Sequence, residues 1–339
     1  MRALLDAMGG DGGPDSAVVA ALDFLRRHPT DEILLAGREQ ELRATLAEKD
    51  SKAGDRLTIL DCSEVVTPDD EPVRAIRQKK DSSMVRGLNA LADGEADFMV
   101  SAGNTGALMS GAVILVGRLC GFERPGLSSV IPTLDHRDLV MLDLGAGVDI
   151  KAKNLVQYAI MGAAYARAVM QKSEPRVALL NIGTEPGKGD RLRRDAYPLL
   201  AEWDGGAGAQ FVGNVEARDL IKGGFDVIVT DGFTGNMVLK SFEGTGDAFR
   251  ELTRRGLKAG FRSRVGGLLA GPSLRVQFRR YAYQAHGGAT LLGIEKPVIK
   301  CHGNAGAVAI ASALEVGHRA VAGDVAGLIS KSLEEVPNG

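Results

Sequence analysis

The chain has 339 residues, of which 45% are hydrophobic and 25% charged, and its formal net charge is −2. This length suits about two domains or one large α/β unit, and the composition is that of a soluble globular protein. The three cysteines have neither CxxC nor zinc-like spacing, and no apolar run approaches the ~18 residues of a membrane span. We therefore expect a cytoplasmic protein without a signal peptide or a transmembrane segment.

Short apolar strands alternate with helical stretches along the chain. Strands are predicted at 2–5, 34–36, 57–61, 98–101, 130–132, 139–144, 177–182, 210–212, 226–230 and 298–301, and helices at 39–48 and 152–170. Asp15 or Ser16 is expected to cap the first helix, and Ser82 or Ser83 a helix after the polar stretch 66–81. This alternation predicts a mostly parallel sheet in a single α/β unit spanning 1–339.

The segment ALLNIGTEPGKGD at 178–190 joins a buried strand to a glycine-rich polar loop. Lys188 lies between Gly187 and Gly189, so a cation stands beside freely accessible backbone amides, which suits an anion. A nucleotide-binding phosphate loop is excluded, because only three residues separate its glycines and Gly189 replaces the Ser or Thr that would bind magnesium. A surface turn with a solvated lysine is the alternative.

Six strands end in loops rich in Gly, Asn, Asp, Ser or His, and SAGNTGALM is one of them. Its residues Ser101, Gly103, Asn104 and Thr105 precede or begin a helix, where free amides favour an anion. In doubly wound α/β proteins, the carboxyl ends of the strands converge on a ligand crevice. We expect all six loops to meet there.

Several motifs, distributed in order along the whole chain, closely resemble the PlsX family of bacterial phosphate acyltransferases. The matching blocks are DAMGGD at 6–11, SAGNTGALM at 101–109, DLGAGVD at 143–149, LLNIGTEPGKGD at 179–190, FVGNVE at 211–216, DVIVTDGFTGNMVLK at 226–240 and GGATLLG at 287–293. The sequence departs from the family pattern at Gly147, Thr290 and His286, and we assign no chemistry to those positions.

The resemblance implies transfer of a fatty acyl group from acyl carrier protein to inorganic phosphate, for phospholipid synthesis. It also implies a homodimer with a Rossmann-like, doubly wound fold related to isocitrate and isopropylmalate dehydrogenases. We expect no cofactor, no metal and no nucleic-acid partner. Two alternatives stay open: an NAD-dependent decarboxylating dehydrogenase of the same fold, for which Asp143, Asp149 and Asp231 are too dispersed, and a non-enzymatic peripheral-membrane scaffold.

Attack of phosphate on a thioester requires a dianion site and donors for an oxyanion. We expect Lys188 with the amides of Gly187 and Gly189, and opposite them Ser101, Gly103, Asn104 and Thr105, to bind phosphate. The amide side chains of Asn181, Asn214 and Asn236 could stabilise the oxyanion.

Three further residues have both a chemical and a structural interpretation. Asp231 could accept a proton or orient Lys240, or it could be a structural ion-pair partner. His302 could protonate the departing thiolate, although a packing role is more common. Cys301 could form an acyl-enzyme, but the preceding strand should bury it.

A basic segment lies at 250–280, with eight Arg and one Lys against Glu251. We expect residues 245–283 to form a protruding hairpin, and 261–281 to be two short amphipathic helices joined near Gly271 and Pro272. Leu268 and Leu269 would form an exposed tip that contacts an anionic membrane at the inner face of the cell membrane, or acidic acyl carrier protein, and an ordinary packed hairpin is the alternative. The flanking arginines are Arg262, Arg264, Arg275, Arg279 and Arg280.

Overall fold

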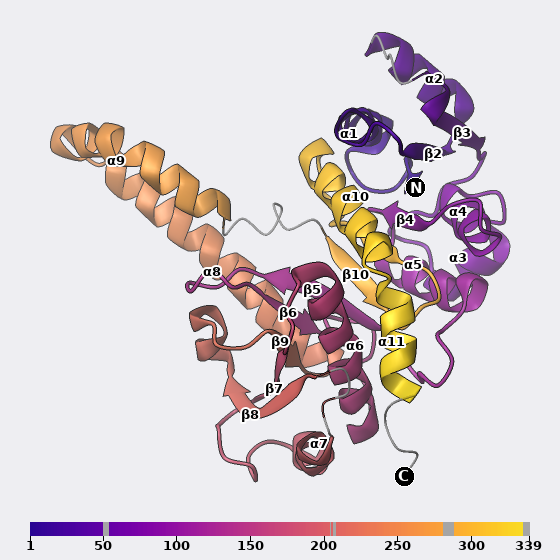
Figure 1. The fold of residues 1–339 in the computed structure, drawn as a ribbon. Coiled ribbons are helices and arrows are strands. Elements are labelled where there is room, and N and C mark those ends of the chain that lie inside the picture. The colour runs from indigo at the N-terminus through magenta and orange to yellow at the C-terminus, as the bar shows by residue number, and fades with distance from the viewer. Residues whose placement is uncertain (50–53, 204, 206–207, 281–287, 335–339) are drawn as a thin grey trace.

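One mixed sheet runs through the whole molecule (Figure 1). The computed structural model describes residues 1–49, 54–203, 205, 208–280 and 288–334. The sheet order is β3-β2-β1-β4-β11-β10-β5-β6-β9-β7-β8. In chain order the strands are β1 Arg2–Asp6, β2 Glu32–Gly37, β3 Leu57–Asp61, β4 Phe98–Ser101, β5 Gly126–Ile131, β6 Leu139–Leu142, β7 Arg176–Asn181, β8 Gln210–Glu216, β9 Val227–Val229, β10 Ala289–Leu292 and β11 Val298–Lys300.

Two parallel groups of strands make up this sheet, and they run in opposite directions. The first group is β3, β2, β1, β4 and β11, and the second is β6, β9, β7 and β8. Between them, β10 and β5 are each antiparallel to both neighbours. The expectation that six strands end at one edge of the sheet is therefore wrong. The carboxyl ends of β4 and β11 lie at one edge, and those of β6, β7, β8 and β9 lie at the opposite edge.

Helices cover both faces of the sheet. They are α1 Gly13–Arg27, α2 Glu39–Glu48, α3 Pro72–Gln78, α4 Ser83–Ala92, α5 Thr105–Gly111, α6 Ala152–Met170, α7 Arg191–Glu202, α8 Gly232–Lys258, α9 Phe261–Arg280, α10 Ala307–Ala322 and α11 Val325–Glu334. Alternate strand residues enter different cores, since Leu4 packs on the α4 side while Leu5 packs on the side of α1 and α10. This alternation is the two-residue period of a sheet buried on both faces.

Helix caps test the local predictions. Ser82 caps α4 as predicted, accepting a hydrogen bond from the backbone N–H of Val85 at 3.3 Å. The cap predicted for α1 is wrong, because the helix begins at Gly13 and leaves Asp15 and Ser16 inside it. The stretch at 66–81 also contains a helix that was not predicted, α3, whose N-terminus is capped by the Glu71 carboxylate.

The α8 and α9 helices form the protruding hairpin seen at the left of Figure 1. Its turn lies between Lys258 and Phe261, and α9 continues through Pro272 as a single helix, so the predicted break near Gly271 is wrong. The aromatic rings of Phe249 and Phe278, one on each helix, lie 6.4 Å apart. Residues 281–283, at the predicted end of the hairpin, are outside the described residues. Among the described helices, none is both long and apolar enough to cross a membrane.

Candidate active site

The loops that follow β1 and β4 are held together by a buried pair of side chains. The Ser101 hydroxyl donates to Asp6 Oδ2 at 2.7 Å and accepts from the N–H of Gly103 at 3.1 Å. Gly9 approaches so closely that an added Cβ would lie 2.6 Å from the Gly103 nitrogen. Ser101 is fully buried. Its geometry does not support the predicted role as a phosphate ligand, because both hydrogen-bonding functions serve the loop.

Asn104 also has a structural role in this loop. Its Oδ1 accepts from the N–H of Ala107 and caps α5, while its Nδ2 lies 3.1 to 3.3 Å from the carbonyl oxygens of Thr67, Pro68 and Asp70. This amide therefore positions its neighbours instead of facing a ligand. Thr105, the first residue of α5, is exposed and remains available at the helix N-terminus.

A buried lysine, which was not among the predicted site residues, lies at the end of β11. Lys300 Nζ donates to the carbonyl oxygens of Cys301 and of Ala102, the latter at 3.4 Å. Burial lowers the pKa of Lys300, while the charge of Asp6 acts in the opposite direction. The lysine thus joins the loops after β4 and β11. A single lysine at the end of the apolar run VIK gives little sequence signal for this position.

Cys301 is 2% exposed, and burial raises the pKa of its thiol to about 12. A thiol in this environment stays protonated at neutral pH and is a poor nucleophile. The burial expected from the preceding strand is confirmed.

The next residue, His302, is exposed and contacts the second half of the molecule. Its Nε2 lies 3.3 Å from Lys240 Nζ on α8, and that ammonium also pairs with Glu243 Oε2 at 2.7 Å. Asn236 precedes Lys240 by one helical turn and is exposed as well. The first turns of α8 therefore face the loop that follows β11.

The loop after β7 carries Lys188 as an exposed cation, with no carboxylate partner among the described residues. Asn181 Nδ2 donates to the carbonyl oxygen of Lys188 at 3.0 Å, and Asn214 Nδ2 donates to that of Glu185 at 2.8 Å. Gly189 has φ +96°, and a Cβ there would lie 2.4 Å from Asn181 Oδ1. Asn181 and Asn214 thus shape the Lys188 loop, an arrangement that does not favour their predicted oxyanion role.

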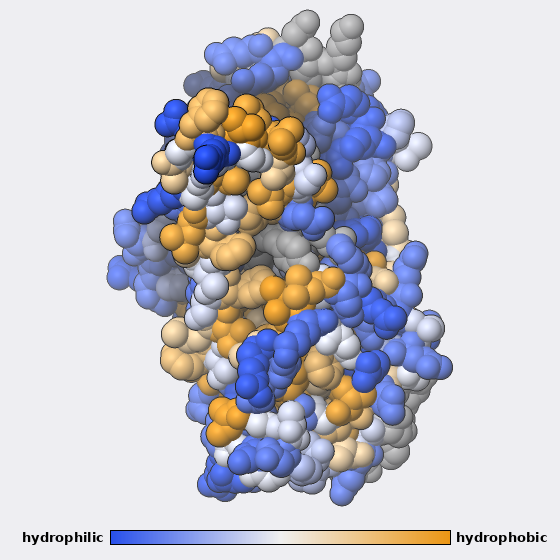
Figure 2. Space-filling model, turned by 90° about the vertical axis from the view of Figure 1, so that its left-hand side faces the viewer, coloured by the Kyte–Doolittle hydropathy of each residue, from blue (hydrophilic) through white to orange (hydrophobic). Residues whose placement is uncertain are grey.

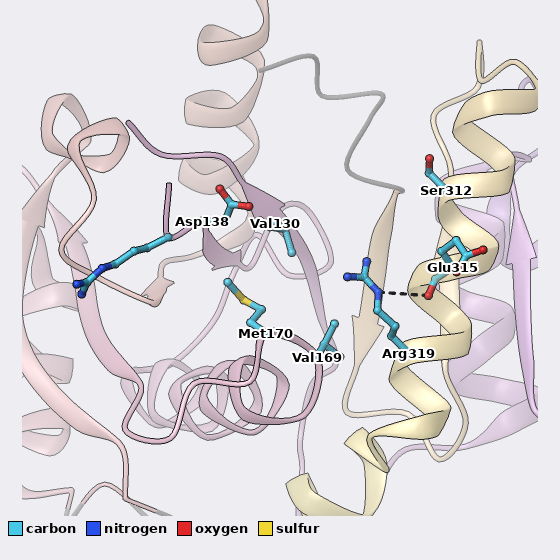
Figure 3. A pocket seen from close by; sticks show the side chains of 8 residues that line it. Val130, Asp138, Val169, Met170, Ser312, Glu315 and Arg319 are labelled. Carbon is cyan, nitrogen blue, oxygen red and sulfur yellow. Dashed lines mark hydrogen bonds between the residues drawn. The ribbon is translucent and has the colours of Figure 1, made fainter. Parts of the chain in front are cut away.

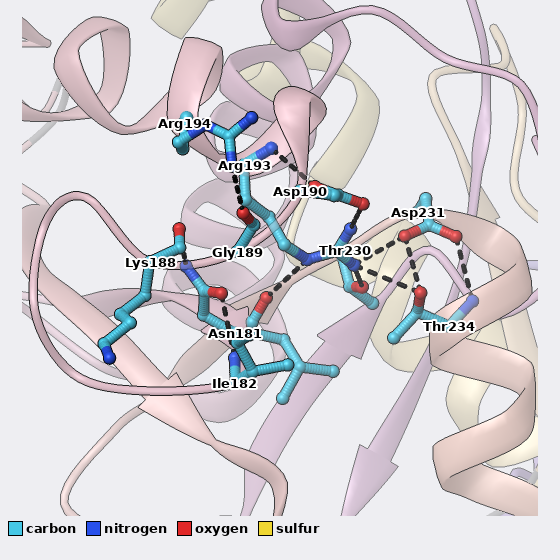
Figure 4. A network of polar contacts seen from close by, with 11 residues as sticks. Asn181, Ile182, Lys188, Gly189, Asp190, Arg193, Arg194, Thr230, Asp231 and Thr234 are labelled. Atoms are coloured by element: carbon cyan, nitrogen blue, oxygen red, sulfur yellow. Dashed lines mark hydrogen bonds and ion pairs between the residues drawn. The ribbon is translucent and has the colours of Figure 1, made fainter.

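Arg193 connects this loop to the start of α8 (Figure 4). Its guanidinium makes five hydrogen bonds, to the Leu180 carbonyl oxygen and to the side chains of Asp190, Thr230, Asp231 and Thr234. The bond to Asp231 Oδ2 is 2.6 Å long, and both side chains are buried. Sequence reasoning missed Arg193, because in RLRRD it resembles the solvated arginines beside it.

Asp231 has a structural partner in Arg193, not in Lys240. It caps α8 by accepting from the N–H and the hydroxyl of Thr234 at 2.9 and 2.7 Å. Burial by itself raises the pKa of Asp231, but the bonds from Thr234 and Arg193 outweigh burial and hold the pKa below its ordinary value. A carboxylate stabilised in this way is a weak proton acceptor.

Asp143, in the loop after β6, is a second buried carboxylate. Burial raises its pKa, opposed by four backbone N–H groups, of Leu127, Gly145, Ala146 and Gly147. Gly147, one of the three departures from the family pattern, thus has a backbone role here. The Thr290 side chain is buried in β10, and His286 lies outside the described residues.

The predicted residues fall into two groups that α8 connects. Ser101, Gly103, Asn104, Thr105 and His302 surround the ends of β4 and β11, while Asn181, Lys188, Gly189, Asn214 and Asp231 surround the ends of β7, β8 and β9. The helix begins beside the second group at Asp231 and contacts the first group through Lys240 and His302.

A cavity of about 520 Å³ elsewhere in the molecule contains none of the predicted residues (Figure 3). Its lining comes from α10, the end of α6 and the β5–β6 region, and includes Arg137, Glu315 and Arg319. It lies apart from the loops that carry the candidate chemistry.

Comparison with known proteins gives consistent matches along the chain. A family model described as "Fatty acid synthesis protein" matches residues 1–328. The phosphate acyltransferases of Lysinibacillus sphaericus (strain C3-41) and Bacillus thuringiensis (strain Al Hakam) are 45% and 43% identical to the chain, each over 99% of both sequences. EutD phosphotransacetylase from Staphylococcus aureus has a TM-score of 0.62 at 13% identity, over 95% of this chain and 94% of that one. At this identity the structural likeness shows the fold alone.

Proposed function

The chain belongs to the PlsX family of phosphate acyltransferases, and we propose that it transfers a fatty acyl group from acyl carrier protein to inorganic phosphate at a site formed by the loop after β11 and the elements around the start of α8. The observation that supports this site most directly is the distance of 3.3 Å between His302 Nε2, after β11, and Lys240 Nζ on α8. This contact brings the loop after β11, in the first group of strands, against α8, which begins after β9 in the second group.

Phosphate needs a fixed positive environment, and the Lys188 loop is the best candidate for it. Its ammonium is exposed, and its backbone is fixed by Asn181, Asn214 and Arg193. A preorganised loop of this kind binds a dianion without reorganising, which is the general source of electrostatic stabilisation in enzymes. From the loop after β4, Thr105 completes the proposed phosphate contacts, since the N–H of Gly103, also predicted as a ligand, already donates to Ser101.

The acyl thioester is proposed to lie along the exposed face of α8. Phe233 and Met237 are 61% and 54% exposed there, beside Asn236 and Lys240. The apolar pair suits an acyl chain, while Asn236 can donate to the thioester oxygen as charge develops on it. His302 is proposed to protonate the leaving thiolate. The attacking phosphate is already anionic, so this scheme requires no cofactor.

Activity of the purified protein is the direct test. We expect acyl phosphate from acyl carrier protein thioester and phosphate, with no nucleotide or metal added. Lys188→Ala should lower kcat/KM for phosphate by roughly 10- to 150-fold, since a charge-assisted contact contributes about 1.5 to 3 kcal/mol. Lys222→Ala, at another exposed lysine, is the control. Unchanged phosphate kinetics in folded Lys188→Ala would place the phosphate elsewhere.

The two alternatives make different predictions in the same assay. A dehydrogenase would reduce NAD with a hydroxy acid substrate and form no acyl phosphate, and a scaffold would do neither. The relation of the doubly wound fold to isocitrate and isopropylmalate dehydrogenases, and the homodimer, stay predictions within this proposal.

The hairpin is proposed to hold the enzyme reversibly at an anionic membrane surface. Phe261, Leu268 and Leu269 are 84%, 79% and 79% exposed, and Arg262, Arg264 and Arg275 lie near them on α9. Figure 2 views the hairpin from its free end and shows apolar residues gathered on this face, with hydrophilic ones around them. Arg279 and Arg280 end the helix, but their side chains are outside the described residues.

A further inference from the structure

Two histidines and two carboxylates gather where α1 packs against α10. His28 directly follows α1, Asp31 precedes β2, and His318 lies on α10. One potential ligand atom from each lies within 4.8 Å of the others. The Asp31 side chain is 7% exposed, while those of His28 and His318 are 22% and 23% exposed.

The Asp31 carboxylate has one oxygen engaged and one without a hydrogen bond. Oδ1 pairs with the N-terminal ammonium of Met1 at 3.1 Å and accepts from the Thr30 hydroxyl at 3.4 Å. Oδ2 is buried and has no hydrogen-bond partner among the described residues, although it lies 3.1 Å from His318 Nε2. In a tetrahedral site with bonds of about 2.0 to 2.2 Å, neighbouring ligand atoms are roughly 3.3 Å apart and point at the ion instead of at each other. The observed pair has this spacing.

A fourth ligand is available from the same helix. Glu315 precedes His318 by three residues, so both side chains lie on one face of α10, in the Glu-x-x-His arrangement by which helices supply metal ligands in carboxylate-bridged metal sites. Glu315 Oε1 lies 2.9 Å from His28 Nε2. The rings of His28 and His318 have centroids 4.3 Å apart.

Neighbouring arginines fix the backbone of the proposed site and leave Glu315 able to exchange its ion pair with Arg27 for a bond to a metal ion. Arg56 Nη1 donates to the carbonyl oxygens of His28 and Asp31 at 3.1 and 3.3 Å, which fixes the connection between α1 and β2. Arg27 pairs with Glu315 but also with Asp23 Oδ2 at 2.8 Å, so it keeps a partner when Glu315 turns to an ion. A fixed supporting shell is the usual requirement of a metal site.

We propose that His28, Asp31, His318 and Glu315 bind one divalent transition metal ion of the zinc class, which clamps α1 to α10. Imidazole ligands select zinc and its neighbours over magnesium and calcium. With all four positions taken by protein groups, the site is structural and takes no part in acyl transfer.

The test is Zn²⁺ binding by the full-length protein after chelator treatment and dialysis. We expect about one Zn²⁺ per chain in the wild type and in His136→Gln, an exposed histidine elsewhere that serves as the control. His28→Gln with His318→Gln should weaken binding at least tenfold, with its fold checked by circular dichroism. Zn²⁺ alone should raise the melting temperature of the wild type but not that of the double variant.

Substitution of Co²⁺ gives a readout that does not depend on the variants. Tetrahedral Co²⁺ bound by imidazole and carboxylate absorbs intensely in the visible range, and we expect this band in the wild type and in His136→Gln. If the double variant does not fold, Asp31→Asn replaces it. Equal Zn²⁺ binding by the wild type and a folded variant, or the absence of the Co²⁺ band, overturns the proposal and leaves a hydrogen-bonded contact between helices.

Discussion

Arg193 shows at the scale of one residue how the loops of the second group are fixed. Its five acceptors come from the end of β7, the start of α7, the end of β9 and the start of α8. A planar guanidinium can reach acceptors in several directions at once, which an ammonium cannot. Arg193 is therefore a positioning residue for the Lys188 loop, not a contact for the substrate.

Replacement of Arg193 should be costly in stability. Arg193→Ala leaves Asp231 buried without its cation, and breaking a buried pair in this way costs about 3 to 5 kcal/mol in the free energy of unfolding. Arg193→Lys should recover only part of the loss. Denaturant unfolding measures both, with Arg191→Ala at an exposed position of the same helix as the control, expected within about 0.5 kcal/mol of the wild type. A loss no larger than that of the control would show that the network contributes little.

Cys301 gives a second prediction at this scale, direct transfer without an acyl-enzyme. Its pKa, raised to about 12 by burial, leaves almost no thiolate at neutral pH. Acid-quenched enzyme incubated with radiolabelled acyl carrier protein should carry no label, and Cys301→Ala should retain activity. Stoichiometric label that disappears in Cys301→Ala would contradict this prediction.

Side-chain roles were harder to predict than side-chain positions. The sequence placed Ser101 and Asn181 correctly at strand ends and Asn104 in the loop after β4, while Asn214, predicted beyond a strand, lies within β8. All four bond to nearby backbone or to Asp6. Small polar residues in glycine-rich loops must satisfy buried backbone groups as well as ligands, and a sequence does not separate these uses.

At the scale of elements, strongly patterned segments were predicted accurately. The strands at 57–61 and 98–101 and the helices at 39–48 and 152–170 have the predicted bounds, because their apolar periodicity is undisturbed. The missed elements include α7, which has twelve residues, as well as shorter ones. β10 has four residues and was seen only as a motif, and because β10 and β5 run antiparallel to their neighbours, the reversal of the sheet was missed as well. Strand direction depends on pairing partners far away in sequence, which local patterns do not encode.

The prediction at this scale is that the hairpin formed by α8 and α9 binds anionic membranes through Leu268 and Leu269. Leu268 and Leu269 lie on the side of α9, two turns beyond the hairpin turn, and stay exposed. Replacing both by Glu puts charge where apolar side chains would enter the bilayer interface, while the nearby arginines each contribute about 1 kcal/mol on anionic lipid. We expect the wild type to sediment with anionic vesicles and the double variant to stay in solution, with activity on soluble acyl carrier protein largely kept.

The same experiment separates the other uses of the hairpin. Leu199→Glu, at an exposed leucine on α7, is the matched control and should still sediment. Persistent vesicle binding by the double variant would exclude these leucines as the anchor. Loss of the dimer or of the fold would show that they pack against protein, and loss of activity with the fold intact would indicate docking of acyl carrier protein.

At the scale of the whole molecule, the reversed sheet requires an element that brings its two halves to one site. The loops after β1, β4 and β11 follow strands of the first group, while Lys188 and Asp231 follow strands of the second group. The α8 helix is capped by Asp231 in the second group and contacts His302 of the first group through Lys240, so it connects the two. If the acyl group is transferred where α8 joins the two loop clusters, catalysis depends on both halves together and not on either cluster alone.

A double-mutant cycle on Lys240 and His302 tests this dependence. Because the two side chains lie 3.3 Å apart, His302→Ala and Lys240→Ala should be non-additive in kcat/KM, with a coupling of at least about 0.5 kcal/mol. The control cycle pairs His302→Ala with Lys222→Ala, on a segment remote from the contact, and should be additive within about 0.3 to 0.5 kcal/mol. Stability measured in parallel distinguishes a catalytic coupling from a structural one, since a purely structural contact would couple in unfolding but not in kcat/KM. Additivity in the first cycle, with both single variants impaired, would mean that the two halves act on separate steps and do not form one site.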